Sequence, residues 1–455
     1  MIRLGLALAA AALVPTPALA QPYYAPRPLV EFANAAWTRD AVLYQINTRQ
    51  FTQEGTFAAA QTQLPRLAEM GVDIIWLMPI QPIGELNRKG SLGSPYAVRD
   101  YRAVNPEFGS EAEFRAFVDE AHRLGMKVIL DWVANHSAFD NPLTHTHPDW
   151  YTRSPEGSLM SPVGTDWSDV ADFDYSQPDL RRYMTESLVY WVCEYGIDGY
   201  RADVAGYVPL DFWETARGEL DTIKPVFLLA EWEQRDLHTR AFDATYAWTW
   251  KEAMQRIVKD GSGAGAIRSY YAEQAESWPH AALRMVYTDN HDQNSWDAVA
   301  SEIYGPAYEA AIALSFVGSG LPLIYNGQEA DLDRKLAFFE KDPIVWRTGR
   351  YDGLFRQLIA LKTRAPALHN GRFGAPMMEV PSDAAADVFA FTRGAAGERV
   401  FAVFNLSPRP QQVQFQQARH HGSYTDAISG ADASFDGGET LPLAPWGYRI
   451  FEESK

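Results

Sequence analysis

The run Val128-Ile129-Leu130, followed directly by Asp131, is the stretch that decides the fold. Before it, Ser110 and Glu113 have the spacing of a helix capping box, and Gly125 stands where a helix beginning there would end. A short and fully apolar strand that directly follows a helix is typical of a parallel sheet covered by helices on its outer face. This unit therefore predicts an α/β architecture.

The same alternation of strand and helix recurs along the chain. Short apolar runs that read as strands are Val42–Ile46, Ile74–Met78, Val128–Leu130, Gly199–Asp203, Val226–Leu229, Thr245–Ala247, Met285–Tyr287 and Leu321–Tyr325. Amphipathic helical stretches lie between them. Eight such units over roughly 250 residues or more predict a closed (β/α)₈ barrel.

The alternation breaks at two places, and these suggest the domain organisation. About 40 residues separate the third strand from its helix, and loops of that length are uncommon unless they are functional. We expect residues 137–178 to form a short excursion over the barrel mouth, within a barrel domain of residues 21–367. From residue 368 to 455, short alternating strands with Gly and Pro turns predict a separate antiparallel β-sandwich.

The first twenty residues have the pattern of a signal peptide. Arg3 is followed by the apolar stretch Leu4–Val14 and by the small-residue cleavage site Ala18-Leu19-Ala20. The mature chain is expected to begin near Gln21 and to be exported, to the periplasm or outside the cell. This apolar stretch falls short of the ~20 residues that span a bilayer, and no later run reaches that length. No cysteine follows the cleavage site, so we expect no membrane or lipid anchor.

The composition excludes several classes of protein. Apolar residues make up 47% of the chain and charged residues 22%, which excludes a largely disordered protein. Forty basic and 58 acidic residues give a net charge of −18, which repels phosphate backbones and argues against a nucleic-acid partner. Cys193 is the only cysteine, so no internal disulfide forms. Its position in a helical apolar pattern predicts a buried packing thiol.

Four acidic residues follow predicted strands, namely Asp131, Asp203, Glu231 and Asp292. The carboxyl ends of barrel strands meet on one face, and that face carries the chemistry of such barrels. A lone Asp after a strand is usually a turn former or a helix N-cap. Four on one face are not explained in that way. They predict an active site built on carboxylates.

Two of these carboxyls have neighbours that suggest different roles. Arg201 lies two residues before Asp203, so both side chains point to the same side of the strand. A fixed cation there is expected to lower the pKa of Asp203 and keep it ionised. Glu231 follows an apolar strand and precedes Trp232, and desolvation is expected to raise its pKa and keep it protonated. Such a pair indicates retaining glycoside hydrolysis, with the carboxyls ~5–5.5 Å apart.

These motifs make the chain resemble the α-amylase superfamily of retaining glycoside hydrolases, over nearly all of the mature protein. The matching motifs are Asp131-Trp132-Val133-Ala134-Asn135-His136, Gly199-Tyr200-Arg201-Ala202-Asp203, Ala230-Glu231 and Asn290-His291-Asp292. The resemblance implies that Asp203 is the nucleophile, Glu231 the acid/base and Asp292 the transition-state stabiliser.

The resemblance also implies which residues bind the sugar. Asp131 and Arg201 would support the site, and His136 and His291 would hydrogen-bond the sugar in the cleaved subsite. Tyr96, in Ser94-Pro95-Tyr96, resembles the family's stacking tyrosine.

The chain departs from the family after the nucleophile. Many α-amylases carry Lys-His there, where this chain has Gly206 and Tyr207. The leaving-group side thus loses two polar groups and gains an aromatic ring, which argues against typical endo-acting cleavage of starch. Tyr207 and Trp232 are expected to line the sugar cleft with Tyr96.

A structural calcium ion is an open expectation. Asn135 and Asp172, the latter in Val170–Asp174 that is similar to the motif closing the family's excursion domain, match oxygen-ligand positions. Calcium needs about six oxygens, and these two residues are the only sources that the sequence suggests. A hydrogen-bonded Asn and a turn Asp explain them equally well. The chemistry itself is expected to need no cofactor.

Two other functions compete with catalysis by carboxylates. His145-Thr146-His147 has the spacing of metal ligands, but a polar segment bounded by Pro142 and Pro148 is better explained as a solvated loop. A glucan-binding protein without activity has no use for a buried acid beside an ionised nucleophile. The sequence therefore predicts a hydrolase of α-1,4-linked glucose oligomers, with an α-glucosidase or transglycosylase of the same superfamily as the alternative. The expected partner is an α-glucan or malto-oligosaccharide.

Overall fold

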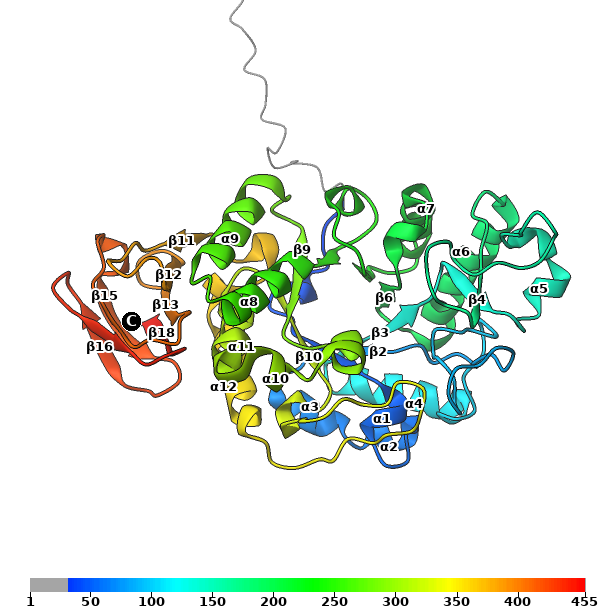
Figure 1. Ribbon diagram of the computed structural model, residues 1–455, viewed down its shortest axis with the longest axis horizontal. Coiled ribbons are helices and arrows are strands. Elements are labelled where there is room, and N and C mark those ends of the chain that lie inside the picture. The colour runs from blue at the N-terminus through cyan, green and yellow to red at the C-terminus, as the bar shows by residue number, and fades with distance from the viewer. Residues whose placement is uncertain (1–31, 455) are drawn as a thin grey trace, which may run out of the picture.

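The fold is a closed barrel of parallel strands, seen in a computed structural model that describes residues 32–454 (Figure 1). The strands follow the order β1-β10-β9-β8-β7-β6-β3-β2 around the barrel. Their bounds are β1 (Leu43–Ile46), β2 (Ile74–Leu77), β3 (Lys127–Trp132), β6 (Gly199–Ala202), β7 (Phe227–Ala230), β8 (Ala244–Tyr246), β9 (Leu283–Tyr287) and β10 (Leu321–Tyr325). Each coincides with one of the predicted runs, so the predicted barrel is confirmed. The predicted signal peptide lies outside the described residues.

Helices follow the strands and cover the outside of the barrel. They are α1 (Thr48–Phe51), α2 (Phe57–Gln61), α3 (Leu64–Met70), α4 (Glu111–Arg123), α6 (Pro178–Tyr195), α7 (Leu210–Asp221), α8 (Trp248–Asp260), α9 (Gly265–Ser277), α10 (Ala300–Tyr304), α11 (Tyr308–Val317) and α12 (Arg350–Arg364). The predicted capping box of Ser110 and Glu113 begins α4. Within residues 32–454, no helix combines the length and the apolar character that crossing a membrane requires.

Helix α6 shows where the prediction for the cysteine is wrong. Leu180, Leu188 and Trp191 of this helix are buried against the barrel, whereas Cys193 is exposed. An α-helix turns by about 100° per residue, so the buried stripe passes through Val192 and leaves the next residue facing outward. The thiol therefore contributes no packing to the core.

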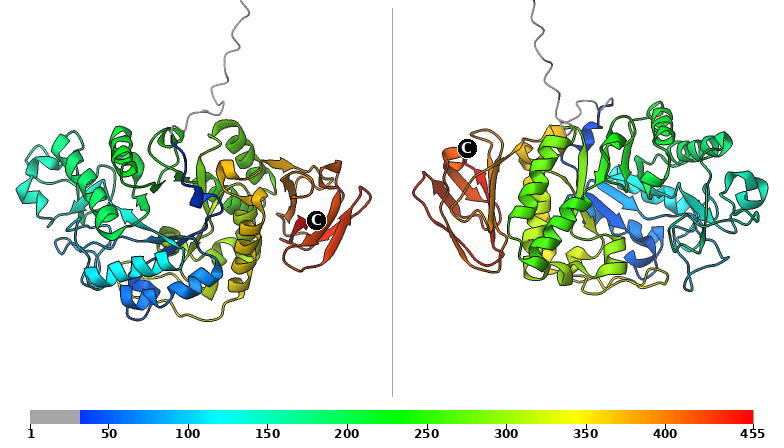
Figure 2. Two further views of the ribbon diagram at one scale, coloured as in Figure 1. Left: turned by 180° about the vertical axis from the view of Figure 1, so that it is seen from behind. Right: turned by 45° about the horizontal axis from the view of Figure 1, so that its top comes forward.

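The excursion after β3 contains a two-stranded antiparallel sheet. Strand β4 (His136–Ala138) pairs with β5 (Val170–Asp172), so that His136 is opposite Asp172. The short helix α5 (Leu143–Thr146) lies between these strands in the chain. Figures 1 and 2 show the excursion at one end of the molecule and the C-terminal strands, coloured orange to red, at the other. The barrel lies between them (Figure 2).

The C-terminal part consists of antiparallel sheets, as predicted. One sheet has the order β11-β12-β13-β18-β15-β16, and β14 pairs with β17. The bounds are β11 (Met377–Glu379), β12 (Val388–Arg393), β13 (Val400–Asn405), β14 (Gln411–Val413), β15 (Gly422–Asp426), β16 (Asp432–Phe435), β17 (Leu441–Leu443) and β18 (Tyr448–Glu453). Phe389 of β12 stacks on Tyr271 of α9 at 5.7 Å, and the Arg393 guanidinium donates to the Gly318 carbonyl at 2.8 Å. Apolar and polar contacts thus join this part to the barrel.

Candidate active site

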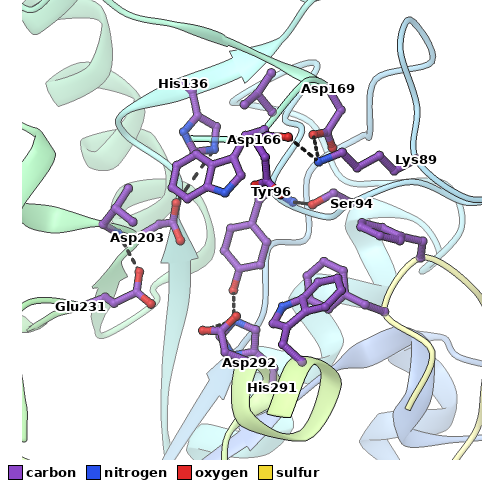
Figure 3. A pocket seen from close by; sticks show the side chains of 16 residues that line it. Lys89, Ser94, Tyr96, His136, Asp166, Asp169, Asp203, Glu231, His291 and Asp292 are labelled. Carbon is purple, nitrogen blue, oxygen red and sulfur yellow. Dashed lines mark hydrogen bonds and ion pairs between the residues drawn. The ribbon is translucent and has the colours of Figure 1, made fainter. Parts of the chain in front are cut away.

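The four predicted carboxylates meet at the carboxyl ends of the barrel strands. Asp131 belongs to β3, Asp203 follows β6, Glu231 follows β7, and Asp292 lies in the segment after β9. The last three line a cavity of about 520 Å³, and Asp131 is fully buried beside it (Figure 3). The structure therefore brings together residues that are up to 161 positions apart in the sequence.

One buried guanidinium holds three of these carboxylates. Arg201 Nη1 donates to Asp131 Oδ1 at 2.8 Å and to Asp203 Oδ1 at 2.9 Å, and Nη2 lies 2.7 Å from Glu231 Oε1. The pairing of β3 with β6 places Arg201 directly beside Asp131. The planar fork of arginine suits several carboxylates at once, which the single ammonium of lysine does not. A single positive charge thus lies among an excess of negative charge.

The pKa values follow from this excess. Burial, and then the negative charge of Glu231, raise the pKa of Asp203 well above its usual range, although Arg201 lowers it. Burial also raises the pKa of Glu231, against the opposing effect of Arg201. The prediction for Glu231 is confirmed, whereas the predicted lowering at Asp203 is wrong. One arginine shared by neighbouring carboxylates does not offset the burial of Asp203 and the repulsion between them.

Tyr96 and His291 form one wall of the cavity. The Tyr96 hydroxyl donates to Asp131 Oδ2 at 3.0 Å and lies 2.8 Å from His291 Nε2, and the two rings stack at 5.6 Å. Gln45 fixes the imidazole, because its Oε1 accepts from the His291 backbone and its Nε2 lies 2.7 Å from Nδ1. Nδ1 is then the acceptor, and Nε2 carries the proton, which is directed at the Tyr96 hydroxyl and lies 3.3 Å from Asp292 Oδ2.

Both predicted histidines are neutral. Burial lowers the pKa of His136 to about 3 and that of His291 to about 3. His136 Nε2 lies 4.0 Å from Asp203 Oδ2, and both histidines line the cavity. Neutral imidazoles in these places can donate hydrogen bonds to hydroxyl groups without adding charge to the cluster.

The segment after the strand that carries Asp203 is tightly constrained. Val204 has a φ of 37°, which is unusual for a β-branched residue, and its backbone N–H donates to Glu231 Oε2 at 2.8 Å. A Cβ on Gly206 would lie 2.1 Å from Cε2 of Trp232. Tyr207 is 49% exposed and its ring lies 5.5 Å from that of Trp232. Tyr207 and Trp232 therefore form a rim beside the cavity rather than its lining.

The two expected calcium ligands lie within hydrogen-bonding distance of each other. The Asn135 amide donates to Asp172 Oδ1 at 3.5 Å, and Thr152 Oγ1 donates to Asp172 Oδ2 at 2.7 Å. Both carboxylate oxygens are thus engaged by donors, and residues 32–454 contain no group of three or more His, Cys, Asp or Glu side chains placed to hold a metal ion. His145 and His147 are exposed. Calcium also takes amide and backbone carbonyl oxygens, so a calcium ion held by Asn135 and Asp172 stays a prediction.

Several further residues of the site were not predicted from the sequence. Trp76 donates to Asp131 Oδ2 at 3.1 Å, and Arg201 Nε donates to the Tyr246 hydroxyl at 3.2 Å. These two aromatic residues and Gln45 lie in β2, β8 and β1, where alternation of the strand identifies inward positions. The other missed residues line the cavity from loops and short elements without a clear periodicity: Lys89, Ser94, Asp166, Trp167, Asp169, Val170, Trp296, Phe338 and Phe339.

Comparison with known families agrees with this geometry. The family model described as "Alpha amylase, catalytic domain" matches residues 34–367, and "Alpha amylase, C-terminal all-beta domain" matches residues 380–444. The first match alone spans well over half of the chain. The protein therefore belongs to the α-amylase family.

Individual relatives extend the likeness to nearly the whole chain. The structure of an alpha-amylase from Lactobacillus plantarum is 32% identical, with a TM-score of 0.82, covering 92% of this chain and 100% of that one. A noncanonic maltogenic alpha-amylase, AmyB from Thermotoga neapolitana, is 28% identical, with a TM-score of 0.84, covering 91% and 99%. Alpha-amylase MalA of Haloarcula japonica is 27% identical over 432 residues, 90% of this chain, which spans 61% of that relative's length.

Proposed function

We propose that this protein is a retaining glycoside hydrolase that cleaves α-1,4-glucosidic bonds in starch-derived oligosaccharides or maltodextrins. The observation that carries this proposal is the arginine-centred cluster, in which Arg201 holds Asp203 and Glu231 at the edge of one cavity. Two carboxyls fixed by one cation are arranged for a nucleophile and an acid/base. The relatives named as alpha-amylases support an α-glucan as the substrate.

The first step of the reaction forms a covalent glycosyl-enzyme. Asp203 attacks the anomeric carbon as the glycosidic bond breaks, and Glu231 gives its proton to the departing oxygen. Burial raises the pKa of both Asp203 and Glu231, so these neighbouring carboxyls retain a proton at a pH where exposed carboxyls are ionised. In the reacting state Glu231 holds that proton, and Asp203 is ionised beside Arg201. In the second step, the Glu231 carboxylate takes a proton from water while the water oxygen bonds to the anomeric carbon and the bond to Asp203 breaks.

The other residues position the sugar and stabilise its charge. Asp292, whose Oδ2 lies 3.3 Å from His291 Nε2, is the third carboxylate at the cavity. Its negative charge stabilises the positive charge that develops on the sugar in the transition state. Neutral His136 and His291 bind sugar hydroxyls. Tyr96 stacks on the glucosyl ring whose glycosidic bond is cleaved. Asp131 and Arg201 act from beneath by holding these groups in place.

Transglycosylation is the second candidate, because the rim favours a sugar acceptor. Trp232 and exposed Tyr207 offer flat apolar faces on the side of Glu231. A sugar that stacks there presents a hydroxyl to the glycosyl-enzyme, in competition with water. The two activities share the first step and differ only in the attacking group.

Retention of configuration is the first test. We expect the initial product from maltoheptaose to have the α configuration at its new reducing end, because two successive inversions restore the original one. Proton NMR during the first minutes reports this before mutarotation, and the same time course reports the proportion of products longer than the substrate. A β-configured initial product would show that water attacks directly and that Asp203 forms no covalent bond.

We further propose that the reaction needs no metal or other cofactor, since every step uses side chains of this chain. Treatment with EDTA followed by gel filtration is expected to leave kcat unchanged at a temperature where the protein stays folded. A loss of kcat in folded protein that a metal ion restores would overturn this proposal, whereas a Tm that falls and is restored by calcium would indicate a structural calcium ion.

Export to the periplasm or the medium is also proposed. Its support is the pattern of Arg3, Leu4–Val14 and Ala18–Ala20, which is typical of a cleaved signal peptide.

A further inference from the structure

A bridging loop, residues 84–93, connects the two sides of the cavity. On one side, the Leu92 backbone N–H donates to the Phe339 carbonyl at 3.1 Å. Ser91 donates from its backbone to Glu340 Oε1 at 2.8 Å and also from its hydroxyl to Glu340 Oε2. Gly90 has a φ of 64°, and a Cβ there would lie 2.4 Å from Cβ of Phe339. The bridging loop is therefore closely packed against the segment that follows β10.

On the other side, the bridging loop is attached to the excursion. Lys89 Nζ lies 3.1 Å from Asp169 Oδ1 and donates to the Asp166 carbonyl at 3.3 Å. The side chain of Asp169 is 6% exposed, so this ion pair is shielded from water on its acidic side. Lys89 and Asp169 both line the 520 Å³ cavity of the carboxylates. The pair thus connects two loops across the edge of the cavity.

The position of the Lys89–Asp169 pair relative to Glu231 determines which end of the substrate the pair faces. Figure 3 shows Lys89 and Asp169 on the side of Tyr96 that is opposite to Glu231. Glu231 protonates the glycosidic oxygen, so the leaving group extends past Glu231 and the non-reducing part of the substrate extends the other way. The pair therefore faces the non-reducing part.

The aromatic wall limits how much sugar fits before the pair. The ring of Phe338 is parallel to that of Tyr96 within 9°, with centroids 6.2 Å apart, and both rings line the cavity. Tyr96 serves the glucosyl unit whose bond is cleaved, and Phe338 offers a second aromatic face beside Phe339, against which the bridging loop packs. Two parallel aromatic rings of this wall are thus available to sugar units.

We propose that the Lys89–Asp169 pair closes the non-reducing end of the cleft and makes the enzyme exo-acting, releasing maltose from non-reducing chain ends. This inference rests on the proposed function and specifies its direction and product length. Two glucosyl units occupy the space between the scissile bond and the pair. A longer glycone would have to break the ion pair and separate the bridging loop from the excursion.

The test uses three chromogenic substrates with the full-length mature enzyme. Free 4-nitrophenyl maltoheptaoside, the same compound blocked at its non-reducing end, and 4-nitrophenyl α-maltoside are each assayed for product length and rate. We expect wild-type enzyme to release maltose first from the free heptaoside and to leave the blocked one uncut. Lys89→Met keeps the stem but removes the charge, and it is expected to cut the blocked substrate at a rate about tenfold or more above the detection limit that wild-type enzyme does not reach, relative to the maltoside.

Two further variants distinguish the effect of opening the Lys89–Asp169 pair from nonspecific effects of a substitution near the cleft. Asp169→Asn opens the same pair from the other side and is expected to act like Lys89→Met, so the result does not depend on one variant folding well. Arg99→Ala is the matched control, because Arg99 also lies near the excursion, 3.6 Å from Asp140 Oδ2, but does not line the cavity. It is expected to leave the blocked substrate uncut.

The outcomes distinguish this inference from the proposed function. Two results with wild-type enzyme would overturn the proposed closure by the Lys89–Asp169 pair and leave the glycosidase assignment intact. They are cleavage of the blocked heptaoside, and glucose or a mixture of longer products from the first turnover. An unchanged ratio in both pair variants, with unchanged Tm, also overturns it. No cleavage of any of the three substrates, including the short maltoside, overturns the proposed function instead.

Discussion

Asp203→Asn is expected to lower kcat by about 10⁴-fold or more, because the amide cannot form the covalent intermediate. Binding is expected to persist, since Tyr96 and His291 are unchanged. The raised pKa of Asp203 means that its ionised form lowers the stability of the fold at neutral pH, so the variant is expected to unfold at the same or a higher temperature. Single-turnover kinetics, calorimetric titration with maltotriose and thermal unfolding measure these three properties.

The matched control for this variant is another acidic residue near the cleft. Asp297 is exposed and does not line the cavity, and Asp297→Asn is expected to retain wild-type kcat. Residual activity of Asp203→Asn within tenfold of wild type, from protein free of contaminating enzyme, would contradict the assignment of the nucleophile. A loss of both binding and Tm would show instead that the residue has a structural role.

Arg201→Met is expected to have the largest effect on stability, about 3–5 kcal/mol at pH 8, because it leaves buried carboxylates without their cation. The guanidinium is fully buried and pairs with Asp131, Asp203 and Glu231. Arg201→Lys is expected to restore part of this loss but little of kcat/KM, since an ammonium cannot reach all three carboxylates in the same geometry. Urea unfolding at several pH values and steady-state kinetics test both expectations.

The pH dependence of this loss has a definite sign. Arg201 lowers the carboxyl pKa values, and burial nevertheless raises that of Asp131 to about 6. Without the arginine these pKa values rise further, so the folded variant binds more protons than the unfolded chain over a wider range. Its stability therefore increases as the pH falls, and the deficit is expected to be smaller at pH 5 than at pH 8. A deficit that does not depend on pH would indicate lost packing and not unpaired charge.

Most of the fold was predictable because its signals are local. Apolar strands such as Ile74–Leu77 are bounded by helix caps and glycines, and the carboxyl ends of parallel strands necessarily meet. The alternation of side chains along β6 also predicted that Arg201 lies beside Asp203. These inferences needed only the period of each element and the order of elements along the chain.

The remaining features depend on distances that no local pattern contains. The raised pKa of Asp203 arises from Glu231, which belongs to another strand, and from the sharing of one arginine among several carboxylates. The exposure of Cys193 depends on the rotation of α6 by a single residue. Lys89 and Phe338 lie in loops without periodicity, and their place in the cavity follows from the contacts of the bridging loop.

The contact between Gly206 and Trp232 has a consequence for how the leaving-group side can change. The indole of Trp232 occupies the space that any side chain at position 206 would need. Introducing the Lys-His pair of many α-amylases at positions 206 and 207 therefore places the new Cβ at position 206 against the indole of Trp232. A polar leaving-group side at position 206 therefore requires that the indole of Trp232 move or be replaced, so the two positions are expected to change together.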